Sequence, residues 1–153
     1  MGYNNNYNKY SNQSWGKGNR QDSYSQESYK LIEIPLHEYY KDKGKLYLPE
    51  GIAHKKARDF YRITSHQLRK ILNQSKACKD EANTNDFVAA KNHLFSLLPL
   101  AAYNAGRDPS LKPLYYFLAE NLNEKSIQSK EDIETFDDLF TSVVAFHKFE
   151  GGK

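Results

Sequence analysis

Residues 129–149 read SKEDIETFDDLFTSVVAFHKF, and their apolar side chains recur at intervals of three and four residues. An α-helix turns by about 100° per residue, so this spacing places them on one helix face. Ser129 stands three residues before Asp132, which is typical of a capping box. Gly151 and Gly152 favour the end of the helix. The stretch therefore predicts a long helix with one buried face. Its inward residues are Ile133, Phe136, Leu139, Phe140, Val143, Val144 and His147.

The preceding part of the chain shows the same spacing. Pro49 and Glu50 are typical of a first helical turn. Thr64 stands three residues before Gln67, which predicts a capping box at the start of the next helix. We expect the polar stretch 79–85 to be a loop that ends this second helix. The inward residues of the first helix are expected to be Ile52, Ala53, Ala57, Phe60 and Tyr61.

Two further helices are predicted between residues 86 and 122. Asp86 can cap a helix that Pro99 should kink or divide and that Gly106 should end. Asp108 and Pro109 then form a cap and a first-turn residue.

The overall pattern predicts a helical protein. Residues 31–48 are less regular, and we expect a short helix at 37–41 followed by a loop. With no convincing strand pattern, the sequence predicts an all-α fold, a single compact bundle of about five helices over residues 31–153. Residues 1–30 contain no Leu, Ile, Val or Phe, so we expect a disordered tail. Its tyrosines either stack on nucleic-acid bases or are simply solvated.

Composition excludes several classes of site. Cys78 is the only cysteine, so the chain has no intrachain disulfide and no zinc-finger pattern. The histidines lack zincin spacing and no glycine-rich phosphate loop is present, so we expect no metal and no cofactor. We see no membrane-spanning run and no signal-peptide core, so the expected location is the cytoplasm.

Charge is strongly polarised along the chain. Residues 43–79 carry ten basic and two acidic side chains, whereas residues 80–153 carry seven basic and twelve acidic ones. Helical phase places Lys55, Arg58 and Arg62 opposite the apolar stripe of the first basic helix, and acidic partners at i±4 are missing apart from Asp59. A concentrated basic face attracts a polyanion, which predicts binding to a nucleic-acid backbone without reading its sequence. The candidate RNA-binding residues are Lys55, Arg58, Arg62, Arg69, Lys70, Lys76 and Arg107.

Other readings of the charged residues stay open. His66 or His147 could serve a small ribonuclease, although His147 lies on an apolar face that favours a structural role. The acidic residues at the start of the last helix favour its dipole and mostly avoid its apolar stripe. The basic face could also dock an acidic protein. The acidic residues are Glu131, Asp132, Glu134, Asp137 and Asp138.

Three segments in order carry a family resemblance. They are TSHQLRKILN at 64–73, LAAYNAGR at 100–107, and VVAFHK at 143–148 with the glycine pair behind it. Together they closely resemble the small helical subunit of the type III-A CRISPR effector, the Csm complex, over about residues 45–150. Residues 1–30 are not part of the pattern.

The resemblance implies a non-catalytic subunit of an antiviral ribonucleoprotein. In that family, copies stack head to tail along the duplex of guide RNA and target RNA and contact mainly the backbone of the target strand. Backbone subunits and the large subunit are the expected protein partners, and no membrane is involved. Of the candidate cations, Arg69 and Arg107 match the family segments.

Overall fold

The structure is a computed structural model that describes residues 29–153. Within that range it contains six helices of eight or more residues, two short helices and one 3-10 turn, with no strand. The long helices are α3 (Ile52–Asp59), α4 (Ser65–Asn83), α5 (Phe87–Phe95), α6 (Leu97–Arg107), α7 (Lys112–Asn121) and α8 (Lys130–Phe149). The short elements are α1 (Leu36–Tyr39), α2 (Lys43–Tyr47) and η2 (Pro109–Leu111). The predicted compact all-α fold is confirmed, while the predicted tail lies almost wholly in residues 1–28, outside the described residues.

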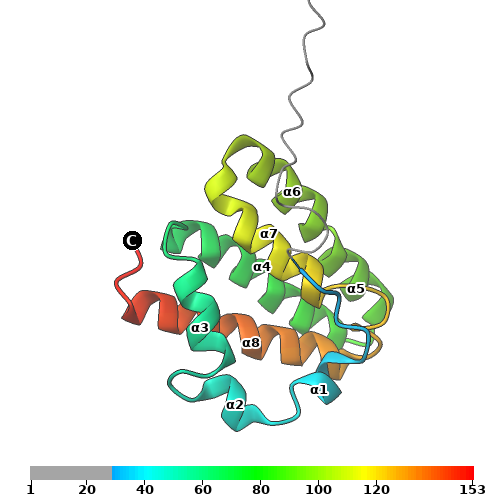
Figure 1. The fold of residues 1–153 in the computed structure, drawn as a ribbon. Coiled ribbons are helices and arrows are strands. Elements are labelled where there is room, and N and C mark those ends of the chain that lie inside the picture. Colours follow the sequence, from blue (N-terminus) through cyan, green and yellow to red (C-terminus); the bar gives the residue numbers. More distant parts are fainter. Residues whose placement is uncertain (1–28) are drawn as a thin grey trace, which may run out of the picture.

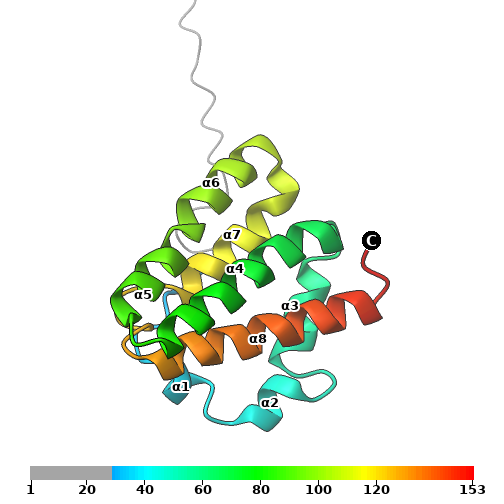
Figure 2. The same cartoon turned by 180° about the vertical axis from the view of Figure 1, so that it is seen from behind.

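Helix α8 is the central element of the bundle. It contacts α1, α2, α3 and α4, and it lies beside α4 in both views of the fold (Figures 1 and 2). Helices α6 and α7 form a hairpin at one end of the molecule, and α2 lies at the other end (Figure 1).

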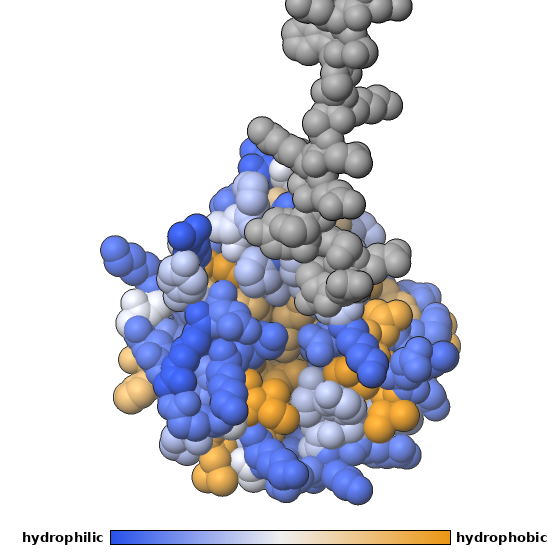
Figure 3. Space-filling model, in the orientation of Figure 1, coloured by the Kyte–Doolittle hydropathy of each residue, from blue (hydrophilic) through white to orange (hydrophobic). Residues whose placement is uncertain are grey.

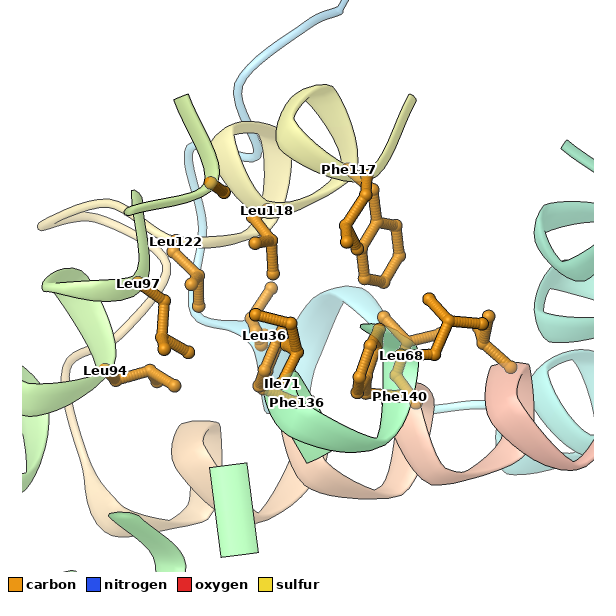
Figure 4. Close-up of a cluster of buried hydrophobic side chains, with 14 of the residues drawn as sticks. Leu36, Leu68, Ile71, Leu94, Leu97, Phe117, Leu118, Leu122, Phe136 and Phe140 are labelled. Atoms are coloured by element: carbon orange, nitrogen blue, oxygen red, sulfur yellow. The ribbon is translucent and has the colours of Figure 1, made fainter. Parts of the chain in front are cut away.

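Aromatic rings from α7 and α8 fill the middle of the core. Phe136 and Phe140 stack with their ring centroids 6.0 Å apart, and Phe117 lies 5.9 Å from Phe140 (Figure 4). All three side chains are buried. Truncating such a ring to alanine typically costs about 3–5 kcal/mol, so these residues hold α7 against α8.

Both predicted capping boxes are present. The Thr64 hydroxyl accepts from the Gln67 backbone N–H, and the Gln67 side chain accepts from the Thr64 backbone N–H at 3.0 Å. Ser129 and Asp132 make the equivalent pair at the start of α8. Each box satisfies two backbone donors that the first helical turn leaves without a partner.

Pro99 divides the predicted helix between residues 86 and 106, as expected. Helix α5 ends at Phe95 and α6 begins at Leu97, so Pro99 lies in the first turn of the second helix. A first-turn proline loses no intrahelical hydrogen bond. The prediction that Gly106 ends this helix is wrong, because α6 continues to Arg107. Its last hydrogen bond runs from the Asp108 N–H to the Asn104 carbonyl oxygen.

Two predicted boundaries near the basic helices are wrong. Residues 79–83 belong to α4, not to a loop, because Cys78 and Ala82 continue its buried face. Pro49 and Glu50 precede α3, because Glu50 has φ 62 and cannot be helical.

The turn before α3 depends on a glycine. A Cβ at Gly51 would lie 2.7 Å from Leu48 O and closer still to Lys45 O. This tight turn follows α2, an element that the sequence analysis expected to be loop.

Four side chains also lie differently from their predicted orientation. Ile52 and Tyr61 are exposed instead of inward. Asp132 and Asp137 are buried, although the acidic residues of α8 were expected to avoid its inner face. Each carboxylate has partners that compensate its burial, as Asp132 shows by accepting from the backbone N–H groups of His37 and Gln128.

No helix within residues 29–153 is both long enough and apolar enough to cross a bilayer.

Candidate nucleic-acid interface

All seven predicted cations have exposed side chains, and the structure separates them into local groups. Lys55 and Arg58 lie on α3, Arg62 lies in the turn after it, and Arg107 ends α6. The remaining three are on α4. Hydrophilic side chains cover the outer face of α3 (Figure 3). The seven cations thus lie on α3, in the turn after it, on α4 and at the end of α6, in separate groups and not in one row.

Arg58 is held by carboxylates from outside its own helix. Its guanidinium donates two hydrogen bonds of 2.6 Å to Glu50, and its Nη2 lies 3.4 Å from Glu150. The hydrogen bonds from Arg58 hold the pKa of Glu50 below its usual value. Neither carboxylate lies at i±4 from Arg58, so helical spacing did not indicate them: the turn at Glu50 and the end of α8 bring both to Arg58.

His54 contacts the same two glutamates, Glu50 and Glu150. Its buried ring stacks on Phe146 at 4.4 Å, its Nδ1 accepts from the Glu50 backbone N–H at 3.0 Å, and its Nε2 lies 2.5 Å from Glu150. Because Nδ1 is an acceptor, Nε2 carries the proton and donates it to the Glu150 carboxylate. This hydrogen bond lowers the pKa of Glu150. The cluster fixes the start of α3 to the end of α8, and no spacing in the sequence indicated it.

Lys76 has a structural partner as well. Its ammonium lies 3.6 Å from the buried carboxylate of Asp137, and Lys79 lies 3.8 Å from the same group. The Ser75 hydroxyl donates to Asp137 at 3.1 Å. A buried carboxylate needs such partners, so Lys76 compensates Asp137 on the α8 side of α4.

The other five cations make no ion pair with a carboxylate among residues 29–153. They are Lys55, Arg62, Arg69, Lys70 and Arg107.

Two separate grooves flank η2, and three of these cations line them. A groove of about 350 Å³ between α4 and α6 is lined by Lys70 and Arg107, and it extends to Asp108 and Leu111. A second groove of about 600 Å³ between α3 and α7 is lined by Arg62 and extends to Pro109 and Ser110. Arg62 thus lies on one side of η2, and Lys70 and Arg107, which are far apart in sequence, line the same groove on the other side. Lys55 lines a different hollow beside α2.

Exposed tyrosines support two of the arginines. The Arg62 guanidinium lies 5.3 Å from the Tyr61 ring centroid, and that of Arg107 lies 5.7 Å from the Tyr103 ring. Tyr61 and Tyr103 are 71% and 63% exposed, so both rings are available at the surface. Helical spacing predicted Tyr61 in the core and did not single out Tyr103. Tyr103 lies four residues before Arg107 on one helix, and this spacing was the signal that could have identified the pair. Tyr61 directly precedes Arg62 after the end of α3, and no spacing indicated their contact.

His66 and His147, the two histidines considered for catalysis, differ in burial. His147 is buried, and its Nε2 donates to the carbonyl oxygens of Ile63 and Phe60 at 2.8 and 3.1 Å. His66 is exposed near the start of α4. His147 therefore holds the turn between α3 and α4, as its apolar surroundings indicated. Within residues 29–153 no group of His, Cys, Asp and Glu side chains has the arrangement of a metal site.

The fold and this surface define a small all-α protein that presents basic side chains around a helical turn. The chain belongs to the Csm2 type III-A family, whose family model matches residues 45–153. This is a family of structural subunits of type III-A CRISPR complexes, and the resemblance seen in the three sequence segments is confirmed.

One curated relative covers most of the chain. The CRISPR system Cms protein Csm2 of Streptococcus thermophilus is 28% identical over 122 residues, which span 80% of this chain and 99% of that protein. No solved structure is significantly similar to the chain.

Proposed function

We propose that this chain is a non-catalytic RNA-binding subunit that lines the duplex of guide RNA and target RNA and contacts the target backbone without sequence specificity. The observation that carries this proposal is that Arg62, Lys70 and Arg107 line the two grooves on either side of η2, each exposed and without a carboxylate partner among residues 29–153. Cations that no internal carboxylate neutralises are free to pair with phosphates. Arg69 on α4 and Lys55 on α3 are two further exposed cations without a carboxylate partner in this range, and Lys55 lines a separate hollow beside α2.

The two ends of the molecule support the proposed head-to-tail stacking of copies. Tyr47, Leu48 and Ile52 are exposed at the end that carries α2. Leu100 and Tyr103 are exposed on α6, at the opposite end (Figure 1). Two different apolar surfaces at opposite ends favour a heterologous contact, which repeats along an open filament. The backbone and large subunits of the Csm complex are the proposed neighbours of such a row.

Salt dependence tests the RNA-binding part of the proposal. We expect the purified chain to bind single-stranded RNA of unrelated sequences with similar affinity. If all five cations without carboxylate partners contact phosphates, log K should fall against log salt with a slope of about −3.5, at about 0.7 per contact on a single strand. A slope near zero would contradict a phosphate-binding surface.

The same preparation separates this function from its alternatives. Cleavage of labelled RNA that His66→Ala or His147→Ala abolishes would identify a ribonuclease instead. Charge reversal at Arg58, Arg62 and Arg69 that breaks assembly with partner subunits but spares RNA binding would identify a protein-only adaptor.

A further inference from the structure

The groove between α3 and α7 combines flat rings with cations. Its volume is about 600 Å³, within the range of small-ligand sites. Tyr29, Tyr61 and Tyr116 contribute rings to its lining, and Arg62 and Lys112 contribute positive charge. Neither ring faces alone nor cations alone would indicate a nucleotide, but the two together match its base and its phosphate.

The ring of Tyr116 already carries a stacked aromatic partner. Tyr29 lies on it with centroids 5.4 Å apart and planes inclined by 23°. Tyr29 is only partly buried and precedes the first core residue, Ile32. Its ring therefore occupies a stacking position without being part of the hydrophobic core, and a flat base of similar shape fits the same position.

The charged side chains of the groove favour a nucleotide, which carries a phosphate, over an uncharged aromatic ligand. Arg62 makes no ion pair with a carboxylate within the described part of the chain, and its guanidinium lies over Tyr61. Lys56 lies 3.3 Å from Asp59, which partly offsets that acid. Glu120, on α7, adds a carboxylate that can accept from a ribose hydroxyl or a base amino group.

We propose that this groove binds one unpaired nucleotide of the RNA strand, with the base on Tyr116 in place of Tyr29 and the phosphate at Arg62. The proposal rests on the proposed function, because it assumes that an RNA strand follows the cations at η2. It adds that the protein holds a base at this point and does not contact phosphates alone.

Two RNA hexamers of equal charge test the inference. One is a uridylate hexamer, and the other has 1-deoxyribose at every position, so that it keeps its phosphates and 2′-hydroxyls and lacks bases. By fluorescence anisotropy we expect the chain to bind the uridylate hexamer about tenfold more tightly, the effect of stacking one base on an aromatic ring. Equal affinity would overturn the inference and leave the proposed function standing. If neither hexamer bound at low salt, both proposals would fall.

Variants then locate the base. Tyr116→Ala should bind both hexamers with the affinity of the base-free one, while Tyr39→Ala, which removes an exposed ring on α1, should keep the tenfold difference. Tyr29→Ala should bind the uridylate hexamer at least as tightly as the unchanged chain, because no ring then has to be displaced. A loss comparable to that of Tyr116→Ala would overturn the displacement of Tyr29.

Photo-crosslinking keeps the test independent of these variants. A 4-thiouridine hexamer should crosslink to the peptides that contain Tyr116 or Tyr61 in the unchanged chain. Crosslinks confined to other peptides would contradict the site even if the affinities agreed.

Discussion

Each terminal nitrogen of the Arg58 guanidinium donates a hydrogen bond of 2.6 Å to the Glu50 carboxylate, across the turn that starts α3. This pairing makes Arg58 different from Arg62, four residues later, which contacts a tyrosine ring. Arg58, on α3, is thus held by a carboxylate, whereas Arg62, in the turn after α3, is exposed and makes no ion pair among residues 29–153. Arg58 can reach RNA only by giving up Glu50, so we propose a smaller RNA contribution from Arg58 than from Arg62.

We expect Arg58→Ala to lower the melting temperature modestly and to leave RNA affinity closer to that of the unchanged chain than Arg62→Ala does. A double-mutant cycle with Glu50→Gln, followed by circular dichroism, should reveal a coupling that fades in 1 M salt, because exposed ion pairs are screened. Additive effects of the two substitutions would contradict the pairing.

Removing a cation at η2 should weaken RNA binding uniformly. Arg62→Ala, Lys70→Ala and Arg107→Ala should each reduce the magnitude of the salt slope by about 0.7 without changing sequence preference. Lys130→Ala, an exposed lysine at the start of α8, is the matched control and should leave the slope unchanged. Anisotropy titrations at four salt concentrations measure the slopes, and a control that behaved like the three variants would argue against a localised surface.

The contact between His37 and Asp132 should make stability depend on pH. His37 Nδ1–H donates a hydrogen bond of 2.6 Å to the Asp132 carboxylate, and this bond raises the pKa of His37. A raised pKa in the folded state stabilises the protein below the unfolded value of about 6.5 and loses that contribution as pH rises through the folded value. We therefore expect the melting temperature to fall as pH rises above 6.5, and His37→Gln to remove this part of the fall. A pH profile that His37→Gln leaves unchanged would rule the contact out as its cause.

Asp132 should matter more than its histidine partner. Burial opposes its ionisation, but backbone donors from His37 and Gln128 outweigh burial and lower the pKa of Asp132. Asp132→Asn keeps the shape and loses charge-assisted acceptors at the start of α8, so we expect it to cost about 2–4 kcal/mol. Urea unfolding measures the loss, and a cost below that of His37→Gln would contradict this ranking.

Gly152 is required by the position of His147. A Cβ on Gly152 would collide with the imidazole ring and lie 2.7 Å from His147 O. Gly152→Ala should therefore displace His147 from the carbonyl groups of Phe60 and Ile63 and cost about 1–3 kcal/mol. Gly106→Ala is the control, because nothing lies within 4 Å of its Cβ and alanine favours a helix by about 0.5–1 kcal/mol. Equal melting temperatures for the two variants would contradict the close approach.

Cys78 should be unreactive in the folded protein. Its side chain is buried in α4, and burial, together with the charge of Glu81, raises its pKa to about 11. The thiolate is the reactive species, so a disulfide reagent at pH 8 should label Cys78 slowly until denaturant is added. Rapid labelling without denaturant would show that α4 opens near this residue.

The spacing of apolar residues in the sequence was enough to predict a helix where that helix has one continuous apolar face. The inner residues of α8, its Ser129–Asp132 box and the Thr64–Gln67 box follow from spacing alone, since they involve residues within one or two turns of each other. Spacing failed for residues 79–83, where polar side chains on the outer face hid the buried Cys78 and Ala82. It also failed at Glu50, whose backbone conformation depends on contacts with His54 and Arg58.

The order of residues alone determined the all-α class, the positions of most helices and the concentration of positive charge in residues 43–79, because these are local or compositional properties. Tertiary structure decided which cations pair with a carboxylate and which do not. Glu150 lies 92 positions from Arg58, and Asp137 lies far along the chain from Lys76, so only folding brings these carboxylates to them. The same folding places Lys70 and Arg107 in one groove although they are far apart in sequence, because a charge interaction depends on distance in space and not on separation along the chain.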